Sequence, residues 1–181
     1  APGSFDVLAA DVGQGNAVLV RTATHSLLYD TGPRYSAESD AGHRVLVPLL
    51  AQMGERLDVV MLSHRDSDHT GGAAAVLAMQ PQAALWSSLE DGHALHGLRP
   101  GWTRCQTGQS WLWDGVLFEV LHPPPESAPG DQDVPPQTRP NEISCVLRIR
   151  DGHASVLLAG DIVPLFIMAL GLTFAIYIGG I

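Results

Sequence analysis

The segment of residues 63–72 constrains this chain more than any other, because it gathers metal-capable side chains in one short stretch. It follows the apolar run 57–62, which is typical of a buried strand, and leads into residues 71–79, whose glycine start and apolar spacing indicate a helix. Two imidazoles and two carboxylates fall within six residues, at His64, Asp66, Asp68 and His69. The sequence therefore predicts a metal site on a loop at the end of a strand.

The spacing of these side chains indicates how they would meet. If the loop is extended, the alternate residues His64, Asp66 and Asp68 can converge on one ion, and His69 can turn toward a second. Imidazole and carboxylate ligands suit a divalent ion such as Zn or Mn, and we expect one or two ions. A solvated turn is the alternative interpretation of a single His-x-Asp pair, but four ligands between a strand and a helix favour the metal site.

Length and charge set limits on the class of protein. The 181 residues suffice for one domain with its own core, and an apolar content of 45% is typical of globular proteins. The net charge of −9, with only 10 Lys and Arg, argues against tight nonspecific binding of nucleic acid by the domain alone, because such binding needs clustered cations. Residues 1–4 have neither a basic nor an apolar stretch, so no signal peptide is predicted there.

The hydrophobic pattern along the rest of the chain predicts a mixture of strands and helices. Strands are expected at residues 5–12, 17–21, 26–30, 57–62, 83–86, 110–113, 116–121, 141–150 and 154–159. Helices are expected at residues 43–53 and 71–79, and polar loops at 33–42, 87–101 and 123–140, the last as a candidate lid. A strand, the metal loop, a helix and another strand form a β-α-β unit, which places the chain in the α/β (α+β) class.

The other histidines and the two cysteines are expected to be ordinary residues. Surface positions are predicted for His25, His43, His93 and His96. Cys105 and Cys145 could pair, but two isolated cysteines without a Cys-x-x-Cys motif are more typical of separate thiols.

At the metal loop the chain resembles a known family. His64-x-Asp66-x-Asp68-His69 is similar to the His-x-His-x-Asp-His signature of the metallo-β-lactamase superfamily, with Asp66 in place of the middle histidine. Residues 63–72 and 11–17 resemble the C-terminal domain of the ComEC branch, which contains the DNA-uptake channels of bacterial competence. In residues 11–17 the family has an aspartate where this chain has Asn16.

The resemblance implies a metallo-β-lactamase-like αββα sandwich and further site residues. It implies that Asp161, in a Leu-Leu-x-Gly-Asp motif, bridges two metal ions and that Asp30, in an Asp-Thr-Gly segment, supports the metal loop. It also makes His122, Asn141 and Ser144 candidates near the metals, from Leu-His-Pro and Asn-x-x-Ser motifs. The exchange of a histidine for Asp66 shifts the expected metal from Zn toward Mn or Mg.

The function that follows from this resemblance is a metal-dependent hydrolase, a phosphodiesterase that acts on DNA during uptake. Asp68 is the candidate catalytic residue, because a carboxylate beside a metal-bound water can transfer a proton. Two alternatives remain open. The chain could be a non-catalytic, membrane-linked module of a DNA-transport assembly, or a small-molecule hydrolase such as a lactonase or esterase.

The C-terminal residues depart from the family pattern. The resemblance covers residues 5–162, and the family then continues with a helix and a His-His-Gly-Ser segment whose histidine completes the second metal's ligands. Here residues 162–181 contain no charge, which fits a transmembrane segment. We therefore expect a 1–161 domain, incomplete at its C-terminus, and an apolar 162–181 tail. The tail could tether a bacterial membrane-associated protein or contact a channel partner, or it could be an altered C-terminus or an artefact of preparation.

Overall fold

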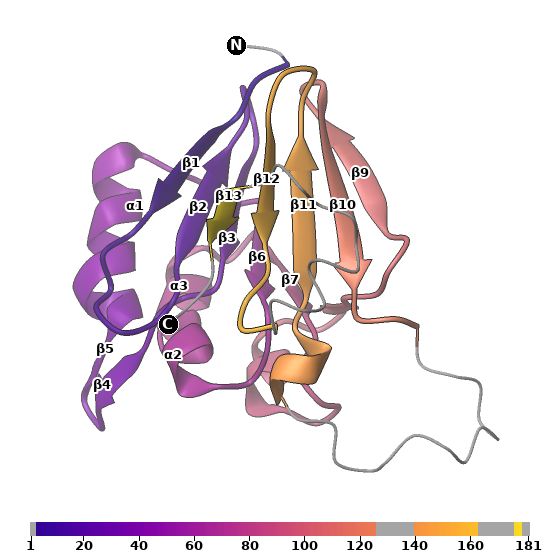
Figure 1. Cartoon of the computed structure of the whole chain (residues 1–181). Coiled ribbons are helices and arrows are strands. Elements are labelled where there is room, and N and C mark those ends of the chain that lie inside the picture. The colour runs from indigo at the N-terminus through magenta and orange to yellow at the C-terminus, as the bar shows by residue number, and fades with distance from the viewer. Residues whose placement is uncertain (1–2, 126–139, 163–175, 179–181) are drawn as a thin grey trace, which may run out of the picture.

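The computed structural model describes residues 3–125, 140–162 and 176–178. Two β-sheets pack face to face, and helices cover the outer side of the first sheet (Figure 1). This arrangement confirms the predicted α/β sandwich class. The described residues form three of the four layers expected for an αββα sandwich.

The first sheet carries the strands that lead to the metal loop. Its order is β1 (Asp6–Ala9), β2 (Val18–Arg21), β3 (Ser26–Tyr29), β6 (Val59–Leu62), β7 (Ala84–Ser87) and β8 (Thr103–Arg104). The first three strands pair antiparallel, whereas β3, β6, β7 and β8 run parallel. Because parallel strands end at the same edge, the residues that follow β3 and β6 meet there.

The second sheet is built mainly from hairpins. Its order is β13 (Ile176–Ile178), β12 (Ser155–Leu158), β11 (Val146–Arg150), β10 (Val116–His122) and β9 (Ser110–Trp113). The predicted Asp-Gly turn joins β9 to β10, with both turn residues at positive φ. Before β11 the chain forms a 3-10 turn, η3 (Pro140–Ile143), so this strand begins five residues later than the pattern predicts.

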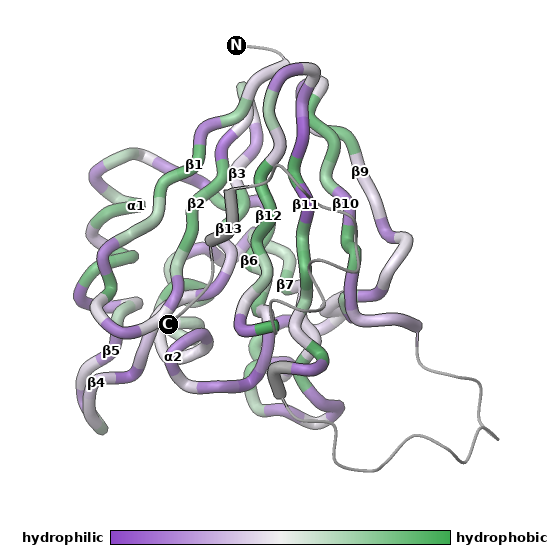
Figure 2. The backbone as a smooth tube through the Cα atoms, viewed as in Figure 1, coloured by the Kyte–Doolittle hydropathy of each residue, from purple (hydrophilic) through white to green (hydrophobic). Residues whose placement is uncertain are grey.

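Alternating side chains of the first sheet build two cores. In β6, Val59 and Met61 face the second sheet, whereas Val60 and Leu62 face the helices. Figure 2 shows hydrophobic residues along strands such as β6 and β12 and also along the helix α1. The helical layer consists of η1 (Gly42–Leu46), α1 (Val47–Met53) and α3 (Ala73–Met79). Gly54 ends α1 at φ 67°, as the pattern predicts.

Three small elements lie where the sequence predicts loops. A hairpin of β4 (Arg34–Ser36) and β5 (Ser39–Asp40) occupies the expected loop 33–42. The 3-10 helix η2 (Ala94–Leu98) lies between β7 and β8. These elements are too short to produce a readable hydrophobic period.

The prediction of surface histidines is wrong for His96. Its side chain is buried, stacks on Trp102 with ring centroids 3.5 Å apart, and hydrogen-bonds to Ser87 at 2.9 Å. The turn sequences Asp91-Gly92 and Pro100-Gly101 flank η2 and favour an exposed loop. The short helix instead packs on the sheet edge and buries this imidazole. His43 is exposed and hydrogen-bonds to Asp40.

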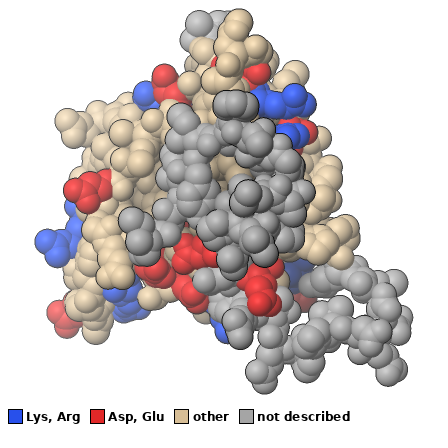
Figure 3. Space-filling model, viewed as in Figure 1, with Lys and Arg blue, Asp and Glu red and all other residues tan. Residues whose placement is uncertain are grey.

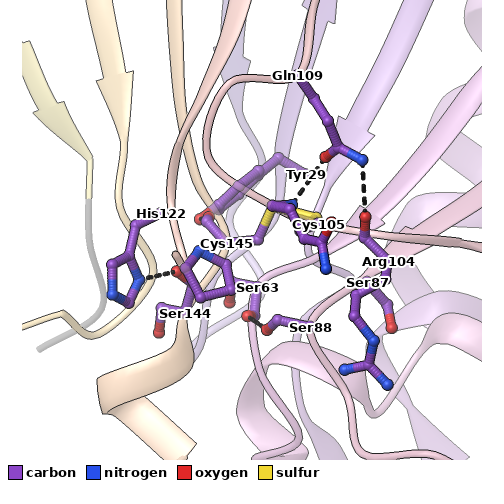
Figure 4. The surroundings of a disulfide bond; sticks show 12 residues. Tyr29, Ser63, Ser87, Ser88, Arg104, Cys105, Gln109, His122, Ser144 and Cys145 are labelled. Carbon is purple, nitrogen blue, oxygen red and sulfur yellow. Dashed lines mark hydrogen bonds between the residues drawn. A yellow bond between two sulfur atoms is a disulfide. The ribbon is translucent and has the colours of Figure 1, made fainter. Parts of the chain in front are cut away.

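The expectation of two separate thiols is also wrong. Cys105 and Cys145 form a disulfide that links the two sheets, with Cα atoms 5.8 Å apart (Figure 4). Cys105 follows β8 and Cys145 precedes β11, so the pair depends on how the sheets stack. Forty residues separate the two cysteines, and no local motif could reveal their contact.

The apolar tail is described only in part. Ile162 is buried, and Ile176–Ile178 form β13, which pairs parallel to β12. A transmembrane segment that includes residues 176–178 is therefore not supported, because these residues pair within the sheet. Residues 163–175 and 179–181, and most of the expected lid loop, lie outside the described residues. Among the helices of the described parts, none is long and apolar enough to cross a bilayer.

Candidate metal centre

The candidate metal centre lies where several strands end at one edge of the sandwich. Asp30 follows β3, His64 follows β6, and Asp161 follows β12. Asp68 and His69 lie in the short helix α2 (Ser67–Thr70), so this part of the loop is helical rather than extended as predicted. Figure 3 shows acidic side chains gathered at the lower edge of the molecule, the edge where α2 lies in Figure 1.

Three side chains from distant parts of the chain meet at this edge. Asp161 Oδ1 lies 3.3 Å from His69 Nε2, and Asp161 Oδ2 lies 3.9 Å from His64 Nε2. One ligand atom from each of the three residues can be chosen so that all lie within 4.8 Å of one another. Two ligands held about 2.1 Å from one tetrahedral ion lie about 3.4 Å apart, so this spacing fits a shared metal ion.

The polar atoms that face one another here are not hydrogen-bonded. His64 Nε2, His69 Nε2 and Asp161 Oδ1 are buried and have no hydrogen-bond partner among the described residues. Buried polar atoms without partners are costly, and they are rare in folded proteins. Three such atoms aimed at one point fit a bound cation, because a divalent ion would satisfy all of them.

The opposite nitrogens of both imidazoles are held in place. His69 Nδ1 lies 2.7 Å from Asp30 Oδ2, and His64 Nδ1 lies 2.9 Å from Ser63 Oγ. Ser63 Oγ also donates to Asp30 Oδ2 at 2.8 Å. Hydrogen bonds of this kind orient an imidazole so that Nε2 points toward a metal.

Asp30 is the centre of this support. Its side chain is fully buried, its backbone has a positive φ of 60°, and it also accepts the Ser63 backbone N–H at 2.7 Å. The predicted supporting position of Asp30 behind the loop agrees with this geometry. Asn16 Nδ2 donates to Asp30 Oδ2 at 3.2 Å, a bond that an ionised aspartate at position 16 could not make.

Without metal, the pKa values of the two imidazoles are shifted in opposite directions. For His69, burial opposes protonation, but the hydrogen bond to Asp30 and the charges of Asp30, Asp161 and Asp68 outweigh it and raise the pKa to about 9. For His64, burial and the neighbouring charge of His69 lower the pKa, although nearby carboxylates act against this. The cluster therefore holds a proton that a metal ion would displace.

The two loop carboxylates lie at the mouth of the cluster. Asp66 Oδ2 is 3.5 Å from His64 Nε2, and Asp68 Oδ2 is 3.8 Å from His69 Nε2. Their side chains are 43% and 40% exposed, whereas both imidazoles are fully buried. Each carboxylate thus lies beside one imidazole and remains partly accessible, whereas His64, His69 and Asp161 are the residues whose ligand atoms converge within 4.8 Å among the described residues.

The other predicted site residues, Ser144, His122 and Asn141, differ in where the structure places them. Ser144 is buried, with Oγ 3.4 Å from His64 Nδ1, so it lies behind the imidazole. His122 Nδ1 donates to the Ser144 carbonyl at 2.9 Å, and burial lowers the pKa of this imidazole (Figure 4). Asn141 lies in η3, and its side chain is outside what the structure describes.

Sequence reasoning missed the residues that hold the site together. Ser63 and Ser88 were not singled out, although the Ser88 hydroxyl bonds to the Ser63 carbonyl. Gly160 was noticed only as part of a motif. A Cβ on Gly160 would lie 2.8 Å from the Ser63 Cβ, so only glycine lets Asp161 approach the loop. Ser63 and Gly160 each adjoin a predicted ligand, which is a signal that the sequence offers, whereas Ser88 adjoins none.

Comparisons with known proteins agree with this geometry. The profile of the metallo-beta-lactamase superfamily matches residues 10–173. "Recombination protein 2" of Haemophilus influenzae is 35% identical over 158 residues, which cover 87% of this chain and 18% of that protein. "Competence protein ComA" of Neisseria gonorrhoeae is 39% identical over 153 residues, 84% of this chain and 19% of that protein. The chain therefore spans about a fifth of the length of these curated relatives.

Solved structures share the architecture. The MIM-2 metallo-beta-lactamase superposes with a TM-score of 0.59 and covers 96% of this chain and 72% of its own. Its sequence identity of 16% means that this likeness shows the fold alone.

Proposed function

The chain belongs to the metallo-beta-lactamase superfamily, whose members are generally hydrolytic and use divalent metals, and from this we propose that it is a metal-dependent phosphodiesterase acting on DNA. One observation carries the proposal: atoms of His64, His69 and Asp161 that lack hydrogen-bond partners among the described residues point at one another beside two partly exposed carboxylates. A metal-dependent hydrolase needs this combination, because bound metal must face both protein ligands and substrate.

We assign metal binding to some of these residues and proton transfer to Asp68. His64, His69 and Asp161 would hold one divalent ion, with Asp66 and Asp68 completing the ligands of one or two ions. Bound there, Zn or Mn would lower the pKa of a water molecule and neutralise phosphate charge. If Asp68 is not fully committed as a ligand, its 40% exposed side chain, 3.8 Å from His69, can take a proton from the attacking water or give one to the leaving oxygen.

The choice of DNA rests on the relatives. Two of them are named for recombination and competence, and both match most of this chain. The net charge of −9 would disfavour a polyanion at the bare site, and bound divalent metal would offset that charge locally. We propose that the domain works at the bacterial membrane beside a channel partner, as the ComEC-like motifs imply.

The test is cleavage of labelled single-stranded DNA after reconstitution with Zn²⁺ or Mn²⁺, with and without chelator. Asp68→Ala should lower kcat about 100-fold or more, as loss of a proton-transfer group does. Asp6→Ala is a matched control, because Asp6 is an aspartate with an 80% exposed side chain on β1. Metal-dependent cleavage that persists undiminished in Asp68→Ala would remove this mechanism.

Assays on the same metal-reconstituted protein test the two alternative functions. A panel of lactones and esters tests the small-molecule hydrolase. If they turn over and DNA does not, the substrate assignment is wrong. A chain that retains metal but hydrolyses nothing would instead support the non-catalytic module of a transport assembly.

A further inference from the structure

An aromatic side chain borders the hollow beside the candidate metal centre. This open hollow, about 330 Å³ in volume, is lined by Gln14, Pro33, Arg34, Tyr35 and Asp68. Asp68 connects it to the metal cluster. Tyr35, on β4, is 42% exposed and is one of few large hydrophobic side chains exposed on the described surface. The hollow therefore joins a carboxylate of the site to an accessible ring.

The Tyr35 ring is held in position before any ligand arrives. Its hydroxyl donates to the Val12 carbonyl at 2.7 Å, and the Arg44 guanidinium lies 5.5 Å from the ring centroid. The hydrogen bond fixes the far end of the side chain, and the cation contacts the π-system. A ring held in this way loses little conformational entropy when a flat group stacks on it.

The β4–β5 hairpin is also fixed against the metal loop. A Cβ on Gly71 would lie 2.1 Å from the Arg34 backbone nitrogen, and one on Gly15 would lie 2.8 Å from Pro33 Cδ. Only glycine allows residues 33–34 to approach the chain this closely at these two positions. The Asn16 N–H in turn donates to the Asp68 carbonyl at 3.1 Å. Tyr35 and Asp68 therefore line one hollow from segments that are packed together, and Figure 1 shows the hairpin at the same edge as α2.

Part of the neighbouring arginine is used inside the hairpin. Arg34 donates through Nε to the Ser36 carbonyl at 3.0 Å and through Nη2 to the Ala37 carbonyl at 2.6 Å. It closes the hairpin turn through two of its five N–H donors, and Tyr35 supplies the aromatic surface of the hollow. A flat aromatic group is the ligand that such a surface selects.

We propose that Tyr35 is a stacking platform for a nucleobase of the DNA strand whose phosphodiester lies at the metal centre. The proposal rests on the proposed nuclease function and adds a base subsite to it. Stacking on one ring is tolerant of sequence, because every base has a π-face. The subsite would position the strand and would not contact the reacting atoms.

The first test measures binding separately from catalysis. The affinity of metal-loaded protein for fluorescein-labelled oligothymidylate is measured by anisotropy, with Ca²⁺ present so that cleavage is slow. Tyr35→Ala should weaken binding about 5- to 100-fold, the range found when a stacking ring is removed. Tyr35→Phe keeps the ring but loses the hydrogen bond to Val12, so its affinity should lie between those of wild type and Tyr35→Ala. Leu112→Ala is the control for loss of an exposed apolar side chain, because Leu112 is 66% exposed on β9.

The second test asks whether the ring contacts a base. Oligonucleotides carrying one abasic position are scanned along the strand. Wild type should lose affinity at one position, and Tyr35→Ala should bind that abasic strand and the intact strand equally. Metal content equal to wild type shows that Tyr35→Ala is folded.

The outcomes separate the two proposals. If wild type neither binds nor cleaves DNA, the nuclease function fails. If wild type binds and cleaves while Tyr35→Ala matches Leu112→Ala, the nuclease stands and the base subsite is wrong. An abasic penalty that survives in Tyr35→Ala would also overturn the subsite.

Discussion

Two histidine–aspartate pairs lie at opposite ends of the sandwich with the same separation. His25 Nδ1 is 3.3 Å from Asp114 Oδ2, where the turns β2–β3 and β9–β10 meet. His69 Nε2 is 3.3 Å from Asp161 Oδ1, where β3, β6 and β12 end. Distance alone cannot tell a structural pair from a metal site.

The difference lies in the other partners of each pair. The Asp114 carboxylate also accepts hydrogen bonds from the Thr22 hydroxyl at 2.7 Å and from the Thr24 backbone N–H at 2.7 Å. These bonds, that of Thr22 foremost, lower the pKa of Asp114 and leave an anion satisfied by the protein itself. His69 Nε2 and Asp161 Oδ1 instead have no hydrogen-bond partner among the described residues. A cluster with unsatisfied atoms is therefore the better candidate for metal.

The largest expected effect on stability comes from the disulfide, which ties the sheets together near the site end. Cys145 follows Ser144, whose hydroxyl lies 3.4 Å from His64, and the loop closed by the bond spans 40 residues. Loop-closure entropy predicts that reduction costs about 4 kcal/mol. Urea unfolding with and without reductant, and of a Cys105→Ser/Cys145→Ser variant, measures it. An unfolding midpoint unchanged by reductant would contradict the link.

The same bond predicts where the domain resides. Disulfides persist in oxidising compartments. Because both cysteines are buried, labelling is done after denaturation, and both should resist maleimide until a reductant is added. Rapid labelling without reductant would place the domain in a reducing compartment.

Substitution of Gly160, next to the candidate metal centre, can be compared with substitution of Gly54, which ends α1. Gly160 and Gly54 both have positive φ, at 55° and 67°, but a Cβ on Gly54 meets nothing within 4 Å. Gly160→Ala should cost about 2–4 kcal/mol and weaken metal binding, because backbone strain adds to a clash with Ser63. Gly54→Ala should cost about 1 kcal/mol and leave metal binding intact. Thermal unfolding and metal titration compare them, and equal effects would mean that the close approach at Gly160 is unimportant.

Asp30 should matter for metal far more than Asp114. Asp30→Asn removes the carboxylate that orients His69 and should weaken metal affinity about 10- to 100-fold. Asp114→Asn should lower the melting temperature without changing metal affinity, because Asp114 lies at the other end. Competition with a chromogenic chelator measures both variants. If Asp114→Asn weakens metal binding as much as Asp30→Asn, the two ends are not independent.

The pH dependence of metal binding changes by the smallest steps, about tenfold for each pH unit. Without metal, the pKa of His69 is raised to about 9, so its proton is held through neutral pH and lost as the pH rises through about 9. A metal ion must displace that proton, so affinity should rise about tenfold per pH unit from about pH 7 to about pH 9 and then level off. Titrations at constant ionic strength measure the slope. A flat profile would mean that His69 does not bind the metal.

The local parts of the molecule could be predicted from sequence. The buried strand, the metal loop and the following helix are contiguous, and each has its own period or motif. The Asp-Gly hairpin was predicted for the same reason. The resemblance carried by the loop correctly indicated the superfamily and its sandwich.

What depends on stacking of the two sheets could not be predicted. The Cys105–Cys145 bond, the burial of His96 and the approach of Gly160 to Ser63 join residues that no local pattern connects. The helical turn at Asp68 and His69 was missed because four residues are too few to show a period. The division into a domain and an apolar tail, and the role of each predicted ligand, remain predictions.

The most direct test of the account is metal content of the chelator-washed and reconstituted chain, measured by elemental analysis beside Asp161→Ala and Asp114→Ala. The account predicts one or two Zn or Mn per chain in wild type and in Asp114→Ala, and a clear loss in Asp161→Ala. Wild type that retains no metal, or Asp161→Ala that retains as much as wild type, would contradict it.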